Sequence, residues 1–296
     1  VNRVSRKIEK SSTDISVPWN ASHVKIEENQ IAKLGRTLFN ISYHVFRLEV
    51  VNCTTIELER DFLVDQDIST FTMTRSNVKT LKSHTFTGDK LEYVELMYNP
   101  IEELENEAFV NMSRLIIIRL NNNNLSTFNA KAFSVLPQLK GLFMSNNKIT
   151  HLGKRSFTFV QKDHFLVDLS RNKIAYIDED VFKGLKSSFS INLSFNSLVS
   201  VSVNIFHLHD FEVVDLRNSR LTSWSGDFAM NDFSISSLKI ENNFDSKLLK
   251  KLLAWAVRNR ITIEMEYPLN SGQSTFFLQR FLAYFVVLVQ TLLFPM

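Results

Sequence analysis

The chain has 296 residues, of which 44% are hydrophobic and 22% are charged, and its formal net charge is +3. This hydrophobic content is enough for a sizeable core and excludes wholesale disorder, while so small a charge gives no electrostatic argument for nucleic-acid binding. Only 7 glycines occur, where average usage would give about 21, and the chain contains no glycine-rich phosphate-binding motif and no nucleophile elbow. The composition therefore excludes the common nucleotide-binding and serine-hydrolase classes.

Residues 1–20 are polar and mildly basic, and they contain no apolar stretch of the kind found in a signal peptide. We expect them to form a disordered leader. Because the chain does not begin with methionine, we expect either that a signal peptide has been removed or that the sequence is a fragment.

Residues 21–246 repeat one pattern with a period of about 24 residues. Each copy places apolar residues at fixed distances around one polar slot, and the spacing between slots is 23 to 25 residues throughout. Such regular spacing over ten slots is not expected by chance. The slots are Asn29, Cys53, Ser76, Asn99, Asn123, Asn147, Asn172, Asn196, Ser219 and Asn243.

The pattern L-x-x-L-x-L-x-x-N-x-L, followed by a phenylalanine, resembles that of the leucine-rich-repeat family, in the 24-residue form usual in its extracellular members. The resemblance implies an α/β solenoid: a leucine-rich-repeat horseshoe of about ten repeats with a parallel β-sheet on its concave face. Within the family, the chain resembles the invertebrate cell-surface adhesion and immune-recognition proteins more than the nuclear or cytosolic members.

The slot residue has a physical role in such a stack. Apolar residues two apart, such as Val94 and Leu96, predict a short strand with one buried face. An asparagine in the following slot can bond backbone groups of the neighbouring coil. Serine bonds less well, so we expect local weakening at Ser76 and Ser219. Cys53, the only cysteine, is expected to be a buried structural thiol, which excludes an internal disulfide and a thiolate metal cluster.

A phenylalanine recurs nine or ten residues after each slot, which predicts a buried aromatic spine on the convex side. Its members are Phe39, Phe62, Phe86, Phe109, Phe133, Phe157, Phe182, Phe206 and Phe228.

The outward positions of the concave sheet lie two, four and six residues before each slot. Most coils place small polar side chains there, such as Thr70 and Thr72, whereas the middle coils place apolar side chains bordered by charges. Such clusters often mark a protein interface, although single surface hydrophobes are normal. We predict that Tyr93, Glu95, Met97, Ile117, Arg119, Phe143, Leu166 and Asp168 bind a partner. A more polar second candidate comprises Asp215, Arg217, Lys239 and Glu241.

Few side chains suggest catalysis or metal binding. His207 and His209 precede Asp210, but we interpret the histidines as a solvated pair on the convex side. Residues 178–180 are acidic and are expected to form an exposed turn. The periodicity brings no serine, histidine and acid together as a triad, so the sequence predicts no catalytic residue, no metal site and no cofactor.

Residues 247–268 resemble the C-terminal cap of the family without its cysteines. An amphipathic helix over 248–257 is followed by a strand over 261–264, and Trp255, Leu252 and Leu249 are expected to seal the last coil. A membrane- or calmodulin-binding helix is the less favoured alternative.

Residues 269–296 resemble a glycosylphosphatidylinositol (GPI) anchor signal, with small residues at 270–272, a spacer and an apolar tail. Asn270 is the predicted lipid-anchor site. A single-pass transmembrane tail is the main alternative, but the apolar run is shorter than the roughly 17–25 residues that a span needs. A buried helix is the third possibility. Sequons predict glycosylation at Asn20, Asn40, Asn52, Asn111 and Asn192, and a further sequon at Asn124 lies close to the slot.

Together these features predict a non-enzymatic extracellular protein, tethered at the cell surface, that binds another protein through its concave face in adhesion or receptor-like recognition. The alternative is a secreted innate-immune recognition factor that acts in a protein complex. The membrane is contacted through the C-terminal tail, no nucleic acid is expected as a partner, and dimerisation stays open.

Overall fold

A computed structural model describes residues 3–6, 15–16, 21–28, 30–31, 33–36, 39–40, 44–55, 57–241 and 244–266. The chain divides into two units, Val1–Glu266 and Tyr267–Met296. All described residues belong to the first unit, so the predicted anchor or transmembrane tail lies outside them. Within the described ranges, no helix has the length and hydrophobicity needed to cross a bilayer.

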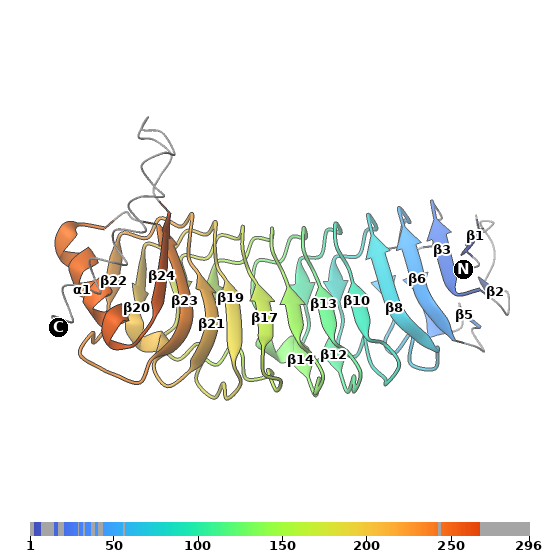
Figure 1. The fold of residues 1–296 in the computed structure, drawn as a ribbon. Helices are drawn as coiled ribbons and strands as arrows, with labels where there is room; N and C mark the ends of the chain where they lie inside the picture. Colours follow the sequence, from blue (N-terminus) through green and yellow to red (C-terminus); the bar gives the residue numbers. More distant parts are fainter. Residues whose placement is uncertain are drawn as a thin grey trace. The chain divides into compact units, whose positions relative to one another are not determined.

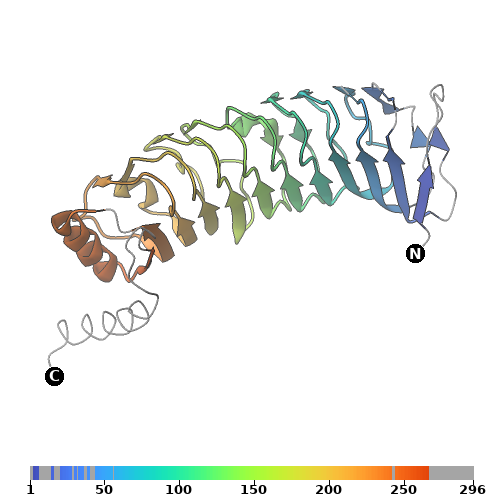
Figure 2. The same cartoon turned by 90° about the horizontal axis from the view of Figure 1, so that it is seen from above.

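Within the first unit, the coils stack into a solenoid, and each turn contributes one strand to a long parallel sheet. In the described part of the chain this sheet has 12 strands in chain order, and it lines the inner side of the arc (Figures 1 and 2). The predicted leucine-rich-repeat type of solenoid is therefore confirmed. The strands are β1 (Arg3–Arg6), β3 (His23–Glu27), β6 (Val45–Val51), β8 (Ile68–Thr74), β10 (Tyr93–Glu95), β13 (Ile117–Arg119), β15 (Gly141–Phe143), β17 (Phe165–Asp168), β19 (Phe189–Asn192), β21 (Asp210–Asp215), β23 (Ser234–Glu241) and β24 (Thr262–Glu266).

The outer side carries short elements, because a turn of about 24 residues leaves few residues for the return path. Among the described residues, two-residue and three-residue strands pair between neighbouring turns, and the 3₁₀ helices η2 (Ala130–Ala132) and η3 (Val203–Phe206) lie among them. The pairs are β2 (Ile15–Ser16) with β5 (Phe39–Asn40), β4 (Lys33–Leu34) with β7 (Glu57–Leu58), β9 (Thr80–Leu81) with β11 (Glu103–Leu104), β12 (Phe109–Val110) with β14 (Phe133–Ser134), β16 (His151–Leu152) with β18 (Tyr176–Ile177), and β20 (Ser200–Ser202) with β22 (Ser223–Ser225).

Two described segments of the expected leader form strands. β1 pairs in parallel with β3, and β2 pairs with β5. The expectation of a disordered leader is therefore wrong for these two segments. The physical reason is that the first full turn presents unpaired backbone groups at its edge, and an extended segment can satisfy them.

The polar slots form the predicted ladder. Asn147 is 7% exposed; its Oδ1 accepts a hydrogen bond from the Leu125 backbone nitrogen (3.0 Å), and its Nδ2 donates to the Leu120 carbonyl (2.9 Å). Asn123, Asn172 and Asn196 repeat this arrangement in their own turns. Asn99 makes the equivalent bond to the Met73 carbonyl, but its Oδ1 accepts from the nitrogen of the slot residue Ser76. The ladder thus supplies partners to buried peptide groups in every central turn.

The substituted slots bond less well, as the sequence predicts. Cys53 is buried, and its Sγ lies 3.4 Å from the Val51 carbonyl. The Ser76 Oγ donates only a long bond of 3.5 Å to the Thr74 carbonyl. Among the described residues, the buried Oγ of Ser219 has no hydrogen-bond partner. Asn29 and Asn243 lie outside the described residues.

The predicted phenylalanine spine is buried from Phe62 to Phe228. The Phe86 and Phe109 rings stack with centroids 5.1 Å apart, and the Phe109 and Phe133 rings with centroids 5.7 Å apart, whereas Phe62 meets Phe86 edge-to-face. The side chain of Phe39 lies outside the described residues. A second buried column, formed by Phe165, Phe189 and Phe211, packs against the spine and was not predicted.

The helix α1 (Ser246–Arg258) covers the last coil, and β24 then pairs in parallel with β23. Asp245 caps the helix by accepting a hydrogen bond from the Leu248 nitrogen at 2.8 Å. Leu252 and Trp255 are fully buried, and the Trp255 ring contacts Phe233 at 5.1 Å between centroids. Leu249 is half-buried.

Candidate protein-binding surface

The register of the parallel sheet brings the predicted partner-binding residues together in adjacent rows. Tyr93, Ile117, Gly141 and Leu166 occupy one row across β10, β13, β15 and β17. The next row, two residues along each strand, holds Glu95, Arg119, Phe143 and Asp168. Met97 follows the end of β10. The eight predicted residues, which we call the concave patch, are Tyr93, Glu95, Met97, Ile117, Arg119, Phe143, Leu166 and Asp168.

The centre of the concave patch is a flat apolar platform. A Cβ atom at Gly141 would lie 2.9 Å from Cε2 of Phe143 and 3.7 Å from Cγ1 of Ile117. The Phe143 ring therefore occupies the space above Gly141 that any larger side chain would fill. Ile117 and Leu166 flank this glycine on the two neighbouring strands. We call Ile117, Phe143 and Leu166 the platform.

The exposure of these side chains differs from the expectation in degree. Leu166 is exposed, at 39%, whereas Tyr93, Met97, Ile117 and Phe143 are half-buried. Strands in a sheet lie only about 4.8 Å apart, so adjacent large side chains cover part of one another. The platform presents ring and aliphatic faces rather than isolated protruding groups.

Charged groups hold the N-terminal side of the concave patch in a fixed arrangement. Glu95 accepts hydrogen bonds from Thr72 Oγ1 at 3.0 Å and from Arg47 Nη1 at 3.2 Å. Arg119 Nε lies 3.5 Å from Glu95 Oε1, and the Arg119 guanidinium carbon lies 4.5 Å from the centroid of the Phe143 ring. Since the Glu95 side chain is only 15% exposed, these contacts are partly shielded from water. The sequence analysis missed Arg47 and recognised Thr72 only as a small polar side chain at an outward position, not as a contact of Glu95.

The second candidate is a set of charges that already satisfy one another. Arg217 Nη2 lies 2.7 Å from Asp215 Oδ2, and Lys239 lies 3.3 Å from Glu264. A hydrogen bond from Ser237 and the nearby Lys239 lower the pKa of Glu264, so this carboxylate stays ionised. An incoming partner would have to break these pairs, which makes this surface the weaker candidate.

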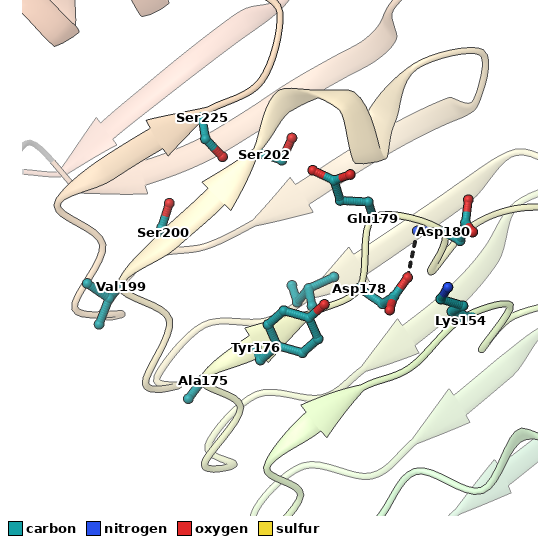
Figure 3. Close-up of a pocket in the computed structure, with 11 residues that line it drawn as sticks. Lys154, Ala175, Tyr176, Asp178, Glu179, Asp180, Val199, Ser200, Ser202 and Ser225 are labelled. Atoms are coloured by element: carbon teal, nitrogen blue, oxygen red, sulfur yellow. Dashed lines mark hydrogen bonds between the residues drawn. The ribbon is translucent and has the colours of Figure 1, made fainter.

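A cavity of about 590 Å³ lies on the convex side and is lined by residues of β18 and β20 (Figure 3). These two strands belong to separate two-stranded sheets. Tyr176, Asp178 and Glu179 line the cavity, and the Asp180 nitrogen donates to Asp178 Oδ1 at 2.9 Å. These acidic residues form the predicted turn. Within the described ranges, no three acidic, histidine or cysteine residues are placed to hold a metal ion.

The prediction of a solvated histidine pair is wrong for His209. Its ring is half-buried against Phe182 and Phe211, with centroids 6.2 and 6.4 Å away. Burial lowers the pKa of His209, because an apolar surrounding disfavours the charged imidazolium. His207 packs against Phe233. The His209 ring thus packs against the second phenylalanine column, which the repeat pattern did not show.

The predicted glycosylation sites fall on different faces. Asn52 and Asn111 are exposed, whereas Asn192 is half-buried on the concave sheet between Asp168 and Asp215. Asn20 and Asn270 lie outside the described residues, and so does the side chain of Asn40.

Comparison with known proteins identifies the repeat. A family profile described as "Leucine rich repeat" matches residues 89–149, 115–162 and 145–198. Chaoptin of Drosophila melanogaster is 30% identical over 132 residues, which cover 43% of this chain and 10% of chaoptin. Lumican of Bos taurus is 29% identical over 167 residues, covering 55% of this chain and 46% of lumican.

Tsukushi of Xenopus tropicalis is 24% identical over 191 residues, covering 61% of this chain and 52% of tsukushi. The chain thus spans from a tenth to about half of the length of these relatives. In a solved structure of the Drosophila Toll–Spätzle complex, one chain aligns with a TM-score of 0.43 and 13% identity over 86% of this chain and 47% of that chain. This structural similarity is too low to support a conclusion.

Proposed function

We propose that this leucine-rich-repeat protein is a non-enzymatic extracellular recognition protein, tethered at the cell surface, that binds another protein through the concave patch. The observation that carries this proposal is the platform over Gly141, where the missing Cβ lets the Phe143 ring lie across the sheet. A half-exposed aromatic ring flanked by aliphatic and charged groups has the composition of a binding hot spot.

The arrangement around the platform favours tight binding. Arg119 is held by Glu95 on one side and by the Phe143 ring on the other, so little side-chain entropy would be lost when a partner covers it. The partner that fits best offers an apolar anchor for the platform and polar groups for Arg119 and Asp168. The apolar contact would supply the affinity, and the charges would select the orientation.

Binding can be tested on living cells. The full chain is displayed on the cell surface, neighbouring proteins are cross-linked through a cleavable reagent, and those recovered are identified by mass spectrometry. Phe143→Ser and Tyr93→Ser should each lose the specific partner. Val199→Ser is a matched control, because Val199 is 51% exposed but lies on the convex side. Equal recovery with all three variants, with unchanged thermal unfolding, would reject the concave patch.

The tether rests on the tail sequence and has its own test. Cells that express the chain behind a working signal peptide are surface-labelled and then treated with phosphatidylinositol-specific phospholipase C. Release into the medium supports the lipid anchor at Asn270, and retention supports a single-pass segment. Protein that reaches the medium without the enzyme would instead favour a secreted recognition factor.

A further inference from the structure

A second surface runs along the edge of the main sheet at which all its strands end (Figure 1). In every central turn, the residue before the slot has a left-handed backbone, with φ between 53° and 60°. The residue after the slot lies beside it. We call these two rows the strand-end rim: Arg75, Tyr98, Asn122, Asn146, Arg171, Phe195 and Asn218 before the slots, and Asn77, Pro100, Asn124, Lys148, Lys173, Ser197 and Arg220 after them.

Backbone hydrogen bonds between turns keep both rows in register. In the first row, the Arg171 nitrogen donates to the Ser194 carbonyl of the following turn at 2.9 Å. In the second row, the Lys173 nitrogen donates to the Ile149 carbonyl of the preceding turn at 2.9 Å. Side chains along the strand-end rim are therefore spaced by the strand separation of about 4.8 Å.

Every charged residue of the two rows is basic, and among the described residues the one carboxylate bonded to a rim residue is that of Glu241, which accepts from the Asn218 nitrogen at 3.0 Å. The charged residues of the rim are the exposed side chains of Arg75, Lys148, Arg171, Lys173 and Arg220, and no aspartate or glutamate occurs in either row. Within the part of the chain that the structure describes, none of these five forms an ion pair, in contrast to the paired arginines of the concave face. Their positive field is therefore available to an anionic ligand.

Aromatic and amide side chains lie among these charges. Tyr98 is 58% exposed and Phe195 is 42% exposed, and the Arg171 guanidinium carbon lies 4.1 Å from the centroid of the Phe195 ring. Asn122 and Asn146 lie between the two aromatic residues, and Asn146 Nδ2 donates a hydrogen bond to Asn122 Oδ1. Bulky side chains are uncommon at positive φ, where asparagine is favoured, so the two aromatic rings are placed at a conformational cost.

We propose that the strand-end rim binds a linear sulfated polysaccharide that lies across successive turns. The cations would pair with sulfate groups, the asparagine amides would bond hydroxyl groups, and the aromatic rings would cover the apolar faces of sugar rings. The two ends of the rim are six turns apart, or roughly 29 Å, so a polymer rather than a single anion fits it. The proposal depends on the extracellular location proposed above but not on the concave patch.

A nucleic acid fits this surface less well. In duplex DNA the bases are stacked on one another, so no ring face is free to pack on Tyr98 or Phe195 without unstacking. A net charge of +3 also falls short of the strongly basic character of nucleic-acid-binding domains.

The test uses the full chain and heparin as the sulfated probe. The triple variant Lys148→Gln, Arg171→Gln, Lys173→Gln is compared with the triple variant Lys131→Gln, Lys140→Gln, Lys186→Gln, which changes the net charge equally at three exposed lysines outside the rim. The rim variant should bind about tenfold more weakly at physiological salt, because each exposed charge contact contributes a few-fold to affinity. The affinity of the control variant for heparin should stay within about twofold of the wild-type affinity, because its three lysines lie outside the rim.

Further measurements separate this surface from general basicity. Tyr98→Ser should weaken heparin binding without changing its salt dependence, and Phe143→Ser should leave it unchanged. Equal losses in the two triple variants, equal binding of desulfated heparin, tighter binding of a DNA duplex than of heparin, or no heparin binding would each overturn the proposal. Loss of heparin binding in Phe143→Ser would transfer the ligand to the concave face and would equally overturn it.

Discussion

Replacing Asn147 by serine should destabilise the solenoid, because the asparagine serves buried backbone groups on two turns. Its Oδ1 accepts from the Leu125 nitrogen at 3.0 Å, and its Nδ2 donates to the carbonyls of Leu120 and Met144 at 2.9 and 3.0 Å. A serine hydroxyl cannot reach both turns. The Leu125 nitrogen would lose its partner, whereas the carbonyls of Leu120 and Met144 would still accept from Asn123 and Asn172. One buried group left without a partner costs about 1–3 kcal/mol, and we expect a loss of that size.

The reverse substitution provides an independent check. The buried Ser219 Oγ has no hydrogen-bond partner among the described residues. In Ser219→Asn, the amide should reach the turn that precedes it, as Asn196 does with Leu169 at 3.0 Å. We therefore expect a gain of about 1 kcal/mol, the net value of a typical intramolecular hydrogen bond.

Urea unfolding followed by circular dichroism and by tryptophan fluorescence would measure both changes. Asn231→Ser is the control: Asn231 is exposed, and its substitution should change stability by less than about 0.5 kcal/mol. If Asn147→Ser costs no more than Asn231→Ser, the ladder amides do not satisfy the buried peptide groups, and the reasoning is refuted. A destabilising Ser219→Asn would show that the slot of that turn has no room for an amide.

Three further predictions concern the core, the half-buried histidine and the platform. Phe109→Ala should lower the free energy of unfolding by about 3–5 kcal/mol, since it removes a fully buried ring stacked between two others, and a urea midpoint unchanged from wild type would contradict this. Burial lowers the pKa of His209 from its usual 6.5, so the unfolded state binds the proton more readily, and stability should fall as the pH drops below about 6.5. Between pH 7.5 and pH 5, the melting temperature should therefore fall less steeply in His209→Gln than in wild type. Equal slopes of melting temperature against pH in the two proteins would contradict the burial effect. Gly141→Ala should move the Phe143 ring and so weaken recovery of the partner, because the new Cβ would lie 2.9 Å from Cε2 of that ring. Stability should change by less than about 1 kcal/mol, because the backbone at residue 141 has no positive φ. Full recovery of the partner would show that the ring position does not matter for binding.

Much of the candidate site could be read from the repeat, because position within a repeat decides which side chains face outward. The eight residues of the concave patch were found in this way, and the register places them in adjacent rows. What could not be read is how they pack. Arg47 and Glu95 are 48 positions apart, two turns along the stack, and no local pattern links them. The flat Phe143 ring depends on a glycine that carries no side-chain signal of its own.

The sequence by itself determined the period, the asparagine ladder, the phenylalanine spine and the parallel sheet. It could do so because each turn of a solenoid contacts mainly its neighbours, so one local pattern, repeated, specifies the whole stack. Only the tertiary structure decided the burial of His209 among the rings of the second phenylalanine column and showed that, among the described residues, the five cations of the strand-end rim form no ion pair. In both cases, residues about 24 positions apart in the sequence become neighbours in space, one strand separation apart. The environment of each side chain is therefore set by residues of the adjacent turns, which no single repeat shows.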